Sequence, residues 1–432
     1  MEIIPTSFPF APDRALQHAS QTLAPMISFL SQAQALAPQL VAWRRDFHQH
    51  PELGFEETRT AGIVADYLQS LGIETRTGVG KTGVVGLIRG NGPGPTVLLR
   101  FDMDALPIDE RNETPYASQN PGRMHACGHD AHTAIGMGAA RLLAQTREQW
   151  AGQVKLLFQP AEEGLGGALA TIQDGVLAHP RVDAAFALHL WNQAAAGQLA
   201  IQAGPFMAAA DRFEIEIIGR GGHGAAPEDT IDAVLVGAEV VNALHHIVSR
   251  NVPPHETAVL SIGSFHAGKA FNVIAERAHL SGTLRTFDET VRTKLLQRMQ
   301  AILGGMSDAH GASAIFNLME EEFTPAVIND AAMTEVVLQV AQQLGMAEQV
   351  VSIQPLMISE DMAEVLNRVP GCYFLLGAEP EGGAQGSHHN PRFDINEAAL
   401  PLGAALMAGV AVHFLQTHGT SGAVLASEHQ DS

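Results

Sequence analysis

Cysteine and positive charge are both scarce in this sequence of 432 residues. The two cysteines, Cys127 and Cys372, lie far apart and belong to no repeated spacing, which argues against a disulfide framework and favours reduced thiols. Lys and Arg number 25 against 46 Asp and Glu, so the formal net charge is −21. Such a charge repels nucleic acid and anionic membranes, and we expect neither as a partner.

Long apolar runs, internal repeats and low-complexity segments are also missing. The opening "MEIIPTSFPFAPDR" lacks the basic start and apolar run of a secretory signal. We find no uninterrupted apolar run of the ~18 residues that a membrane span needs. The sequence therefore predicts a cytoplasmic globular protein, and its 46% hydrophobic content is sufficient for a large core.

Short apolar runs with many branched residues predict buried strands at residues 96–101, 154–158 and 184–190. Helical patterns lie between these runs, at residues 134–150 and 167–178. Alternation of strand and helix is typical of parallel βαβ units with right-handed crossovers. Further helical patterns cover residues 38–49, 56–71 and 397–416.

The pattern changes near residue 206. Alternating strands at 211–219, 257–265, 276–287 and 313–319 are interleaved with helical patterns at 231–250 and 289–309. The order β-α-β-β-α-β is that of a ferredoxin-like α+β unit. We therefore predict a discontinuous α/β domain with a mostly parallel sheet, formed by residues 1–205 and 323–432, and an inserted domain formed by residues 206–322.

Polar side chains follow the predicted strands at their carboxyl ends, where ligands bind in open α/β sheets. Asp102 and Asp104 follow the first run, Glu162 and Glu163 follow the second, and His189 ends the third. The segment "MHACGHDAHT" adds further polar residues in a loop that leads into a helix. It contains Cys127 and His129, followed by Asp130, which we expect to cap the first helical turn.

Thiolate, imidazole and carboxylate are the ligands of a divalent transition metal. A lone buried Cys or His is more often a core residue than a ligand, but convergence at several strand ends favours a metal site. Neighbouring side chains in extended chain point to opposite sides. One carboxylate of the pair Glu162–Glu163 can thus bind metal while the other acts as a general base on water.

Two other histidine pairs have spacings that suit a metal. His388 and His389 lie in a Gly- and Pro-containing loop before a helix, and one of them could complete the site. His48 and His50 lie at the end of a predicted helix, away from the strand ends, and we interpret them as structural.

Nine segments, in this order, resemble a known family: "WRRDFHQHPELGFEE", "RFDMDALPIDE", "MHACGHDAHTA", "FQPAEEG", "LHLW", "GRGGHGAAPED", "FNVIAERAHLSGTLRTF", "ISEDMAEVL" and "HHNPRFDINEAALP". They are similar to the two-metal amidohydrolases related to aminoacylase and carboxypeptidase G. The likeness is greatest for the branch of hippurate hydrolase, N-acyl-amino-acid amidohydrolases and auxin-conjugate hydrolases, and it spans about residues 38–415. Residues 1–37 match no motif and receive no function.

The resemblance implies a role for each site residue. The metal ligands would be Cys127, His129, Glu163, His189 and His389, since the last motif is usually His-any-Pro. Glu162 would be the general acid and base, and Asp104 would orient a ligand. Two divalent ions are implied, zinc or manganese, with cobalt or nickel as further options.

The resemblance also implies that the inserted domain is a lid and dimerisation domain, so that the protein forms a homodimer or a larger homo-oligomer. His223 would polarise the scissile carbonyl, sometimes from the partner subunit. Asn272 and Arg285 would hold the free carboxylate of the substrate. A histidine that is common in this branch is replaced by Glu228, which leaves acyl specificity open.

Together these features predict metal-dependent hydrolysis of N-acyl-L-amino acids, either hippurate-like or N-acetylated, to a carboxylic acid and a free amino acid. A dipeptidase or carboxypeptidase acting on small peptides is the nearest alternative. A metal-dependent binding protein without catalysis is the other, although a spare carboxylate such as Glu162 has no purpose in a closed structural site.

Overall fold

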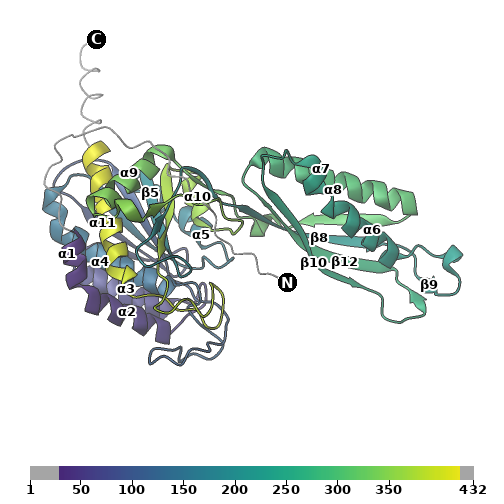
Figure 1. The fold of residues 1–432 in the computed structure, drawn as a ribbon, viewed down its shortest axis with the longest axis horizontal. Coiled ribbons are helices and arrows are strands. Elements are labelled where there is room, and N and C mark those ends of the chain that lie inside the picture. Colours follow the sequence, from purple (N-terminus) through teal and green to yellow (C-terminus); the bar gives the residue numbers. More distant parts are fainter. Residues whose placement is uncertain (1–28, 419–432) are drawn as a thin grey trace, which may run out of the picture.

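The computed structural model describes residues 29–418, which form two bodies joined by extended segments (Figure 1). The larger body contains an eight-stranded sheet in the order β1-β2-β4-β3-β5-β16-β6-β15. Its strands are β1 (Glu74–Val79), β2 (Gly83–Arg89), β3 (Thr96–Asp102), β4 (Gln153–Gln159), β5 (Ala184–Trp191), β6 (Leu199–Ala200), β15 (Val350–Val351) and β16 (Gly371–Gly377).

The centre of this sheet is parallel, with antiparallel pairs on both sides of it and a parallel pair, β6 and β15, at one edge. Strands β4, β3 and β5 run parallel to one another, as the three apolar runs predicted, and β16 pairs parallel with β5. β2 pairs antiparallel with both β1 and β4, and β6 pairs antiparallel with β16. All seven residues of β3 are buried, and so are all seven of β16, which is typical of strands covered on both faces.

Helices cover both faces of the large sheet (Figure 1). One face carries α1 (Phe29–Ala35), α2 (Ala37–Gln49), α3 (Thr58–Ser70), α4 (His129–Thr146), α9 (Ala331–Gln343) and α11 (Ala399–His418). The other carries α5 (Gly167–Gln173) and α10 (Met362–Leu366). Strand β3 serves both cores, because Val97 and Leu99 pack on the α4 side and Leu98 packs on the α10 side.

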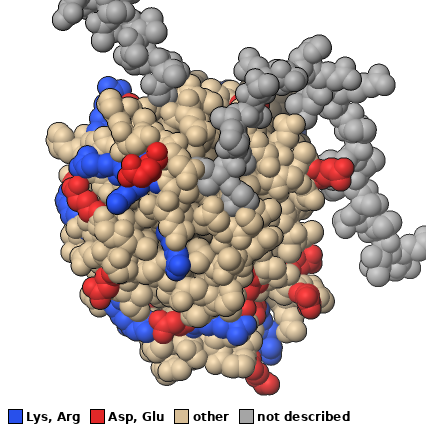
Figure 2. Space-filling view, turned by 90° about the vertical axis from the view of Figure 1, so that its left-hand side faces the viewer, with Lys and Arg blue, Asp and Glu red and all other residues tan. Residues whose placement is uncertain are grey.

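Helix α11 is apolar on all sides. Among the described residues it is the one helix long and apolar enough to cross a membrane, but 89% of that stretch is buried inside the protein. An all-round apolar helix is expected in the core of a large domain. On the face of the larger body shown in Figure 2, basic and acidic side chains are interspersed and form no broad basic patch.

The smaller body is a four-stranded antiparallel sheet in the order β10-β12-β8-β13. Its strands are β8 (Ala209–Ile218), β10 (Ala258–Ala267), β12 (Arg277–Thr286) and β13 (Ser313–Leu318). Helices α6 (Ala233–His245), α7 (Ile247–Asn251) and α8 (Glu289–His310) pack on it around a separate apolar core. The order of elements is the predicted ferredoxin-like one.

Two neighbouring segments connect the bodies. β7 (Gly204–Met207) pairs with β14 (Val327–Asn329), and Ala210 forms a bridge with Thr324. The domain boundaries at 205/206 and 322/323 stay a prediction. Residues 1–28 of the unassigned segment 1–37 lie outside the described residues.

Candidate active site

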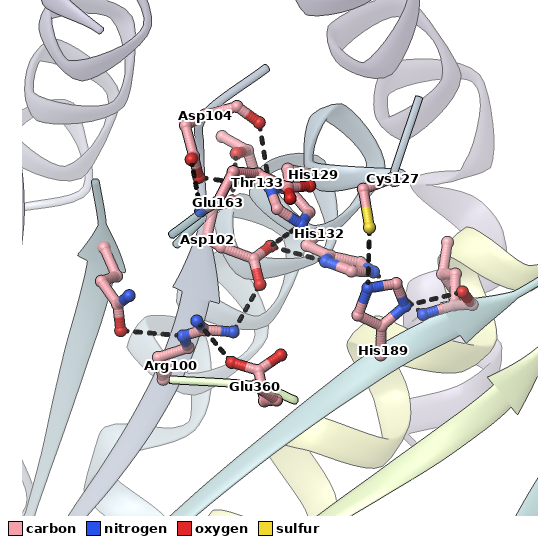
Figure 3. Close-up of polar contacts among 12 residues, drawn as sticks. Arg100, Asp102, Asp104, Cys127, His129, His132, Thr133, Glu163, His189 and Glu360 are labelled. Atoms are coloured by element: carbon pink, nitrogen blue, oxygen red, sulfur yellow. Dashed lines mark hydrogen bonds and ion pairs between the residues drawn. The ribbon is translucent and has the colours of Figure 1, made fainter. Parts of the chain in front are cut away.

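The predicted polar side chains gather at the carboxyl edge of the parallel strands (Figure 3). Asp102 is the last residue of β3, Glu162 follows β4, and His189 lies near the end of β5. Cys127 and His129 reach the same edge from the start of α4. Gly128 between them adopts a left-handed conformation with φ 89°, which lets the chain turn sharply into the helix.

Cys127, His129 and His189 form the centre of the cluster. The Cys127 Sγ atom lies 3.4 Å from His189 Nε2, and the ligand atoms of all three residues lie within 4.8 Å of one another. His189 Nδ1 donates to the Leu190 carbonyl at 2.8 Å, which directs its Nε2 atom toward Cys127. The three side chains are buried, so they are oriented by the fold.

Asp104 orients both His129 and Glu163. His129 Nδ1 donates to the Asp104 carbonyl at 2.9 Å and lies 3.2 Å from the Asp104 carboxylate. The second carboxylate oxygen accepts the Glu163 backbone N–H at 2.9 Å. His129 Nε2 therefore points into the cluster, and it has no hydrogen-bond partner within residues 29–418.

Glu162 and Glu163 lie in a turn and not in extended chain, so the expectation that they point to opposite sides is wrong: one carboxylate oxygen of each lies within 4.8 Å of the other and of His129. Glu163 Oε1 lies 3.3 Å from His389 Nε2, and its carboxylate forms one group with His389 and Cys127. Glu162 can approach the same centre, since its carboxylate also groups with Glu163 and His129. Burial, reinforced by nearby acidic residues, raises the pKa of Glu162 well above its ordinary value.

The structure distinguishes the two histidines of the last motif. His389 has a positive φ of 63°, a rare conformation for a residue with a side chain, and this directs its imidazole toward Glu163. His388 faces elsewhere: its Nε2 atom donates to the Leu190 carbonyl at 3.0 Å, and its ring stacks on Trp191.

This set of donors fits a divalent cation. Burial and the neighbouring His132 lower the pKa of His189 well below its ordinary value, so its imidazole is neutral and able to ligate. The buried atoms His129 Nε2 and Glu163 Oε1 have no hydrogen-bond partner in the described part of the chain. In a native protein such buried polar atoms are normally satisfied, and a cation would satisfy both.

A buried charge network lies beneath the cluster, and the sequence did not reveal it. Arg100 contacts Asp102 and, at 2.8 Å, Glu360 (Figure 3). It also lies 2.8 Å from Asp361. Asp102 in turn accepts from His132 Nδ1 at 2.6 Å. An arginine inside the apolar run "TVLLRF" was the available signal, because a fully buried guanidinium requires acidic partners.

Two expectations about the neighbouring residues need correction. Asp130 does not cap α4, because Arg44 Nε and His48 Nδ1 hold its carboxylate at 2.8 and 2.7 Å. His48 is interpreted as structural, but it is not remote from the cluster. It contacts Asp130, the residue next to His129. Arg44 is fully buried, so this contact attaches α2 firmly to the first turn of α4.

A cavity of about 420 Å³ opens over the cluster. Polar residues of the cluster line one side, including Cys127, Glu162 and His389, and Arg285 of the smaller body lines another. The remaining wall contains the apolar side chains Met207, Trp191, Met357 and Ile358. Arg285 donates to Ser359 Oγ at 3.0 Å and forms no ion pair with a carboxylate of the described chain.

His223 and Asn272 do not reach this cavity within one chain. They lie at the outer end of the smaller body, where β9 (Gly222–His223) pairs with β11 (Val273–Ile274) (Figure 1). The Gly224 N–H donates to the Asn272 carbonyl at 2.8 Å, so His223 and Asn272 lie near each other. Both are exposed, and neither lines the cavity.

Comparison with known proteins is consistent with this geometry. Residues 98–413 match the family described as "Peptidase family M20/M25/M40". An N-acyl-L-amino acid amidohydrolase of Geobacillus stearothermophilus is 49% identical over 278 residues, covering 64% of this chain and 75% of the relative. Thermostable carboxypeptidase 2 of Saccharolobus solfataricus is 39% identical over 379 residues, covering 87% and 95%.

Among solved structures, a dinuclear metal-binding peptidase of the M20 family from Bacillus subtilis superposes with a TM-score of 0.79. It is 34% identical in sequence, and the match covers 89% of this chain and 99% of that one. A divalent metal centre and the predicted α/β fold therefore have support from the sequence motifs, the side-chain cluster and a solved relative. The chain belongs to peptidase family M20/M25/M40, as its nine ordered motifs indicated.

Proposed function

We propose that this enzyme hydrolyses the amide bond of N-acyl-L-amino acids and releases a carboxylic acid and a free amino acid. The observation that carries the proposal is the position of Glu162, a carboxylate additional to the Cys, His and Glu donors and close enough to group with His129 and Glu163. A site that only bound metal would not need it. A relative named as an N-acyl-L-amino acid amidohydrolase supports the substrate class.

Two divalent ions would be held by Cys127, His129, Glu163, His189 and His389. Thiolate and imidazole favour zinc, and carboxylate suits manganese, so these two metals are the first to test, before cobalt and nickel. When bound, such ions polarise a carbonyl and lower the pKa of water. Asp104 would fix His129 in the tautomer whose Nε2 faces the metal.

Glu162 would move the proton. Water adds to the amide carbonyl carbon, a C–O bond forms and the C–N bond breaks. Glu162 takes the proton from the water and delivers it to the leaving nitrogen, so the reaction is balanced without another reactant. A carboxyl group whose pKa is raised by burial can carry a proton between these two steps at neutral pH.

Arg285 would bind the free carboxylate of the substrate. Its guanidinium lines the cavity, and burial lowers its pKa from the ordinary value with little compensation from Asp211. A partly desolvated cation without a carboxylate partner is a suitable dock for an anion. The apolar wall formed by Met207, Met357 and Ile358 would accept an uncharged acyl group or side chain.

His223 and Asn272 would act on the cavity of a second subunit in a homodimer. Both are exposed at the far end of the smaller body, beside Phe271, whose side chain is fully exposed. Val273, two residues along, is also exposed, and neighbouring exposed apolar side chains of this kind are a candidate interface. In this arrangement His223 would stabilise the oxyanion and Asn272 would help Arg285 bind the substrate.

Peptides are the competing substrates, because a carboxypeptidase is among the relatives. The wild type and Glu162→Gln should be compared on N-acetyl-L-methionine, hippurate, a dipeptide and N-acetyl-L-methionine amide. We expect turnover of the first two, a large loss on the amide that lacks the carboxylate, and a loss of about 10²-fold or more in Glu162→Gln. Faster turnover of the dipeptide would replace the proposal with a peptidase.

Unchanged turnover in Glu162→Gln would instead contradict the role of the base. A preparation that binds metal and hydrolyses none of the four compounds would favour a binding protein. We place the reaction in the cytoplasm, with small molecules as the partners and without nucleic acid or a membrane.

A further inference from the structure

One motif has no part in the proposed chemistry. The loop "PELGFEE" (residues 51–57) follows α2 and its two histidines. It nevertheless contacts both turns that carry the acidic site residues. The Ala105 N–H, next to Asp104, donates to the Glu52 carbonyl at 2.8 Å, and Leu53 forms a parallel bridge with Ala105.

The same loop contacts Ala161, the residue before Glu162. Gly54 approaches so closely that a β-carbon there would lie 3.0 Å from the Ala161 Cα atom. Glu57, whose side chain is completely buried, accepts the Ala161 N–H on Oε1 at 2.8 Å. Its other oxygen accepts from the Thr82 hydroxyl at 2.5 Å.

Ala161 has an unusual backbone that requires such support. Its φ is 54°, in the left-handed region that is costly for residues with a β-carbon. Its carbonyl accepts from the Gly167 N–H at 3.0 Å, and its own N–H is bonded only to Glu57. The turn begins here and determines the directions in which Glu162 and Glu163 leave the strand.

We propose that Glu57 is a positioning residue: by holding the Ala161 N–H, it fixes the left-handed turn that presents Glu162 and Glu163 to the metal cluster. The role rests on the proposed function for Glu162 and on the metal site for Glu163. It depends on an acceptor atom and not on a negative charge. Burial raises the pKa of Glu57, with Thr82 and the backbone donors acting in the opposite direction, so charge is costly here.

Comparing Glu57→Gln with Glu57→Ala shows whether the site needs the acceptor oxygen of Glu57 or its negative charge. Glutamine keeps Oε1 for the Ala161 N–H, and its amide can donate to the Thr82 hydroxyl, whereas alanine leaves the Ala161 N–H without a partner. Glu56→Gln is the matched control, because Glu56 is in the same loop but its side chain pairs with Arg123 at the surface. Each variant is measured as the full-length protein.

Two readouts are needed, and one of them does not use a substrate. The first is titration of metal-free protein with Co²⁺, followed by the visible absorbance of the bound ion. The second is kcat and KM for N-acetyl-L-methionine. In Glu57→Ala we expect Co²⁺ affinity to fall about tenfold or more, as for other residues that orient a ligand. We also expect kcat to fall about 10-fold to 10²-fold with KM within about twofold.

Glu57→Gln should stay within about threefold of the wild type in both readouts, because the acceptor is retained. Loss of function in Glu57→Gln equal to that in Glu57→Ala would contradict the acceptor role, and so would wild-type Co²⁺ affinity in Glu57→Ala. If the wild type hydrolyses no N-acyl-amino acid, the proposed function fails while the Co²⁺ titration still decides the role of Glu57.

If Glu57→Ala does not fold, Thr82→Val replaces it. This variant keeps the shape of the side chain and removes only the hydroxyl that holds Glu57 Oε2. The proposal then predicts a loss of Co²⁺ affinity that Glu56→Gln does not show. Equal affinities in these two variants would overturn it.

Discussion

His389 and His388 show how one backbone angle separates a candidate ligand from its neighbour. The sequence alone left both open, and the family resemblance selected His389. The structure places His389 beside Glu163 and His388 against Trp191. Cys127, His129, Glu163 and His189 were also expected at one edge, because residues at the ends of parallel strands converge there.

Other residues could not be predicted because their partners are remote in the sequence. Arg44 meets Asp130 across 86 positions, and Arg100 meets Asp361 across 261. The periodicity of a sequence indicates which face of a helix or strand is buried, but it does not indicate which side chain of another element that face contacts. His223 and Asn272 were predicted as site residues, and within one chain the fold keeps them away from the cavity.

The two cysteines should differ in reactivity once metal is removed. Cys127 lines the cavity, whereas burial raises the pKa of Cys372 to about 12. A bound metal would protect Cys127, and the thiolate is the reactive form of cysteine. We expect iodoacetamide at pH 8 to label Cys127 only after chelation, and slowly, because burial raises its pKa as well.

Peptide mapping by mass spectrometry would measure this difference, with Cys372 labelled only after unfolding. Equal labelling of Cys127 before and after chelation would argue against its role as a ligand.

At the scale of elements, α4 shows why packing and chemistry are linked. Its first turn carries His129, and its middle is packed tightly against the sheet. A β-carbon at Gly136 would lie 2.7 Å from the rings of Phe101 and Phe158. In α8, a β-carbon at the exposed Gly304 would meet nothing within 4 Å.

Alanine at these two glycines should therefore have opposite effects. Gly136→Ala should lower the free energy of unfolding by about 1–3 kcal/mol through overpacking. Gly304→Ala should raise it by about 0.5–1 kcal/mol, since glycine is a poor helix former. Urea unfolding of the metal-free proteins measures both, and a stabilised Gly136→Ala would show that α4 packs less closely than described.

The elements that sequence patterns predicted were those with strong periodicity. The parallel strands β3, β4 and β5 and the long helices α2, α3, α4, α8 and α11 lie within a few residues of their expected positions. No strand was predicted at β1 and β2, at the two-residue strands β6 and β15, or at the central strand β16. The two-residue strands β6 and β15 are too short to carry an alternating pattern.

At the scale of the whole molecule, the smaller body separates residues that the family resemblance brings together. Arg285, in β12, is at the cavity, and His223 lies in the separate two-stranded sheet of β9 and β11 at the far end of the smaller body (Figure 1). The homodimer that we propose would place the two beside the same substrate, each from a different chain. Activity would then require the dimer, and the monomer would be inactive.

Complementation between two inactive variants tests this arrangement. Glu162→Gln and His223→Ala should each be inactive alone. Co-expressed, they should recover about a quarter of wild-type activity, because about half of the dimers are mixed and each mixed dimer contains one intact site. If mixed dimers form without recovering activity, His223 does not act from the partner.

Metal content and amide hydrolysis, measured on one purified preparation, test the central claim most directly. The preparation would be analysed before chelation, after it, and after addition of zinc, manganese or cobalt, with N-acetyl- and N-benzoyl-L-amino acids as substrates. We predict about two ions per chain, loss of hydrolysis on chelation, and recovery with at least one metal. Hydrolysis that continues at full rate in metal-free protein would contradict the account.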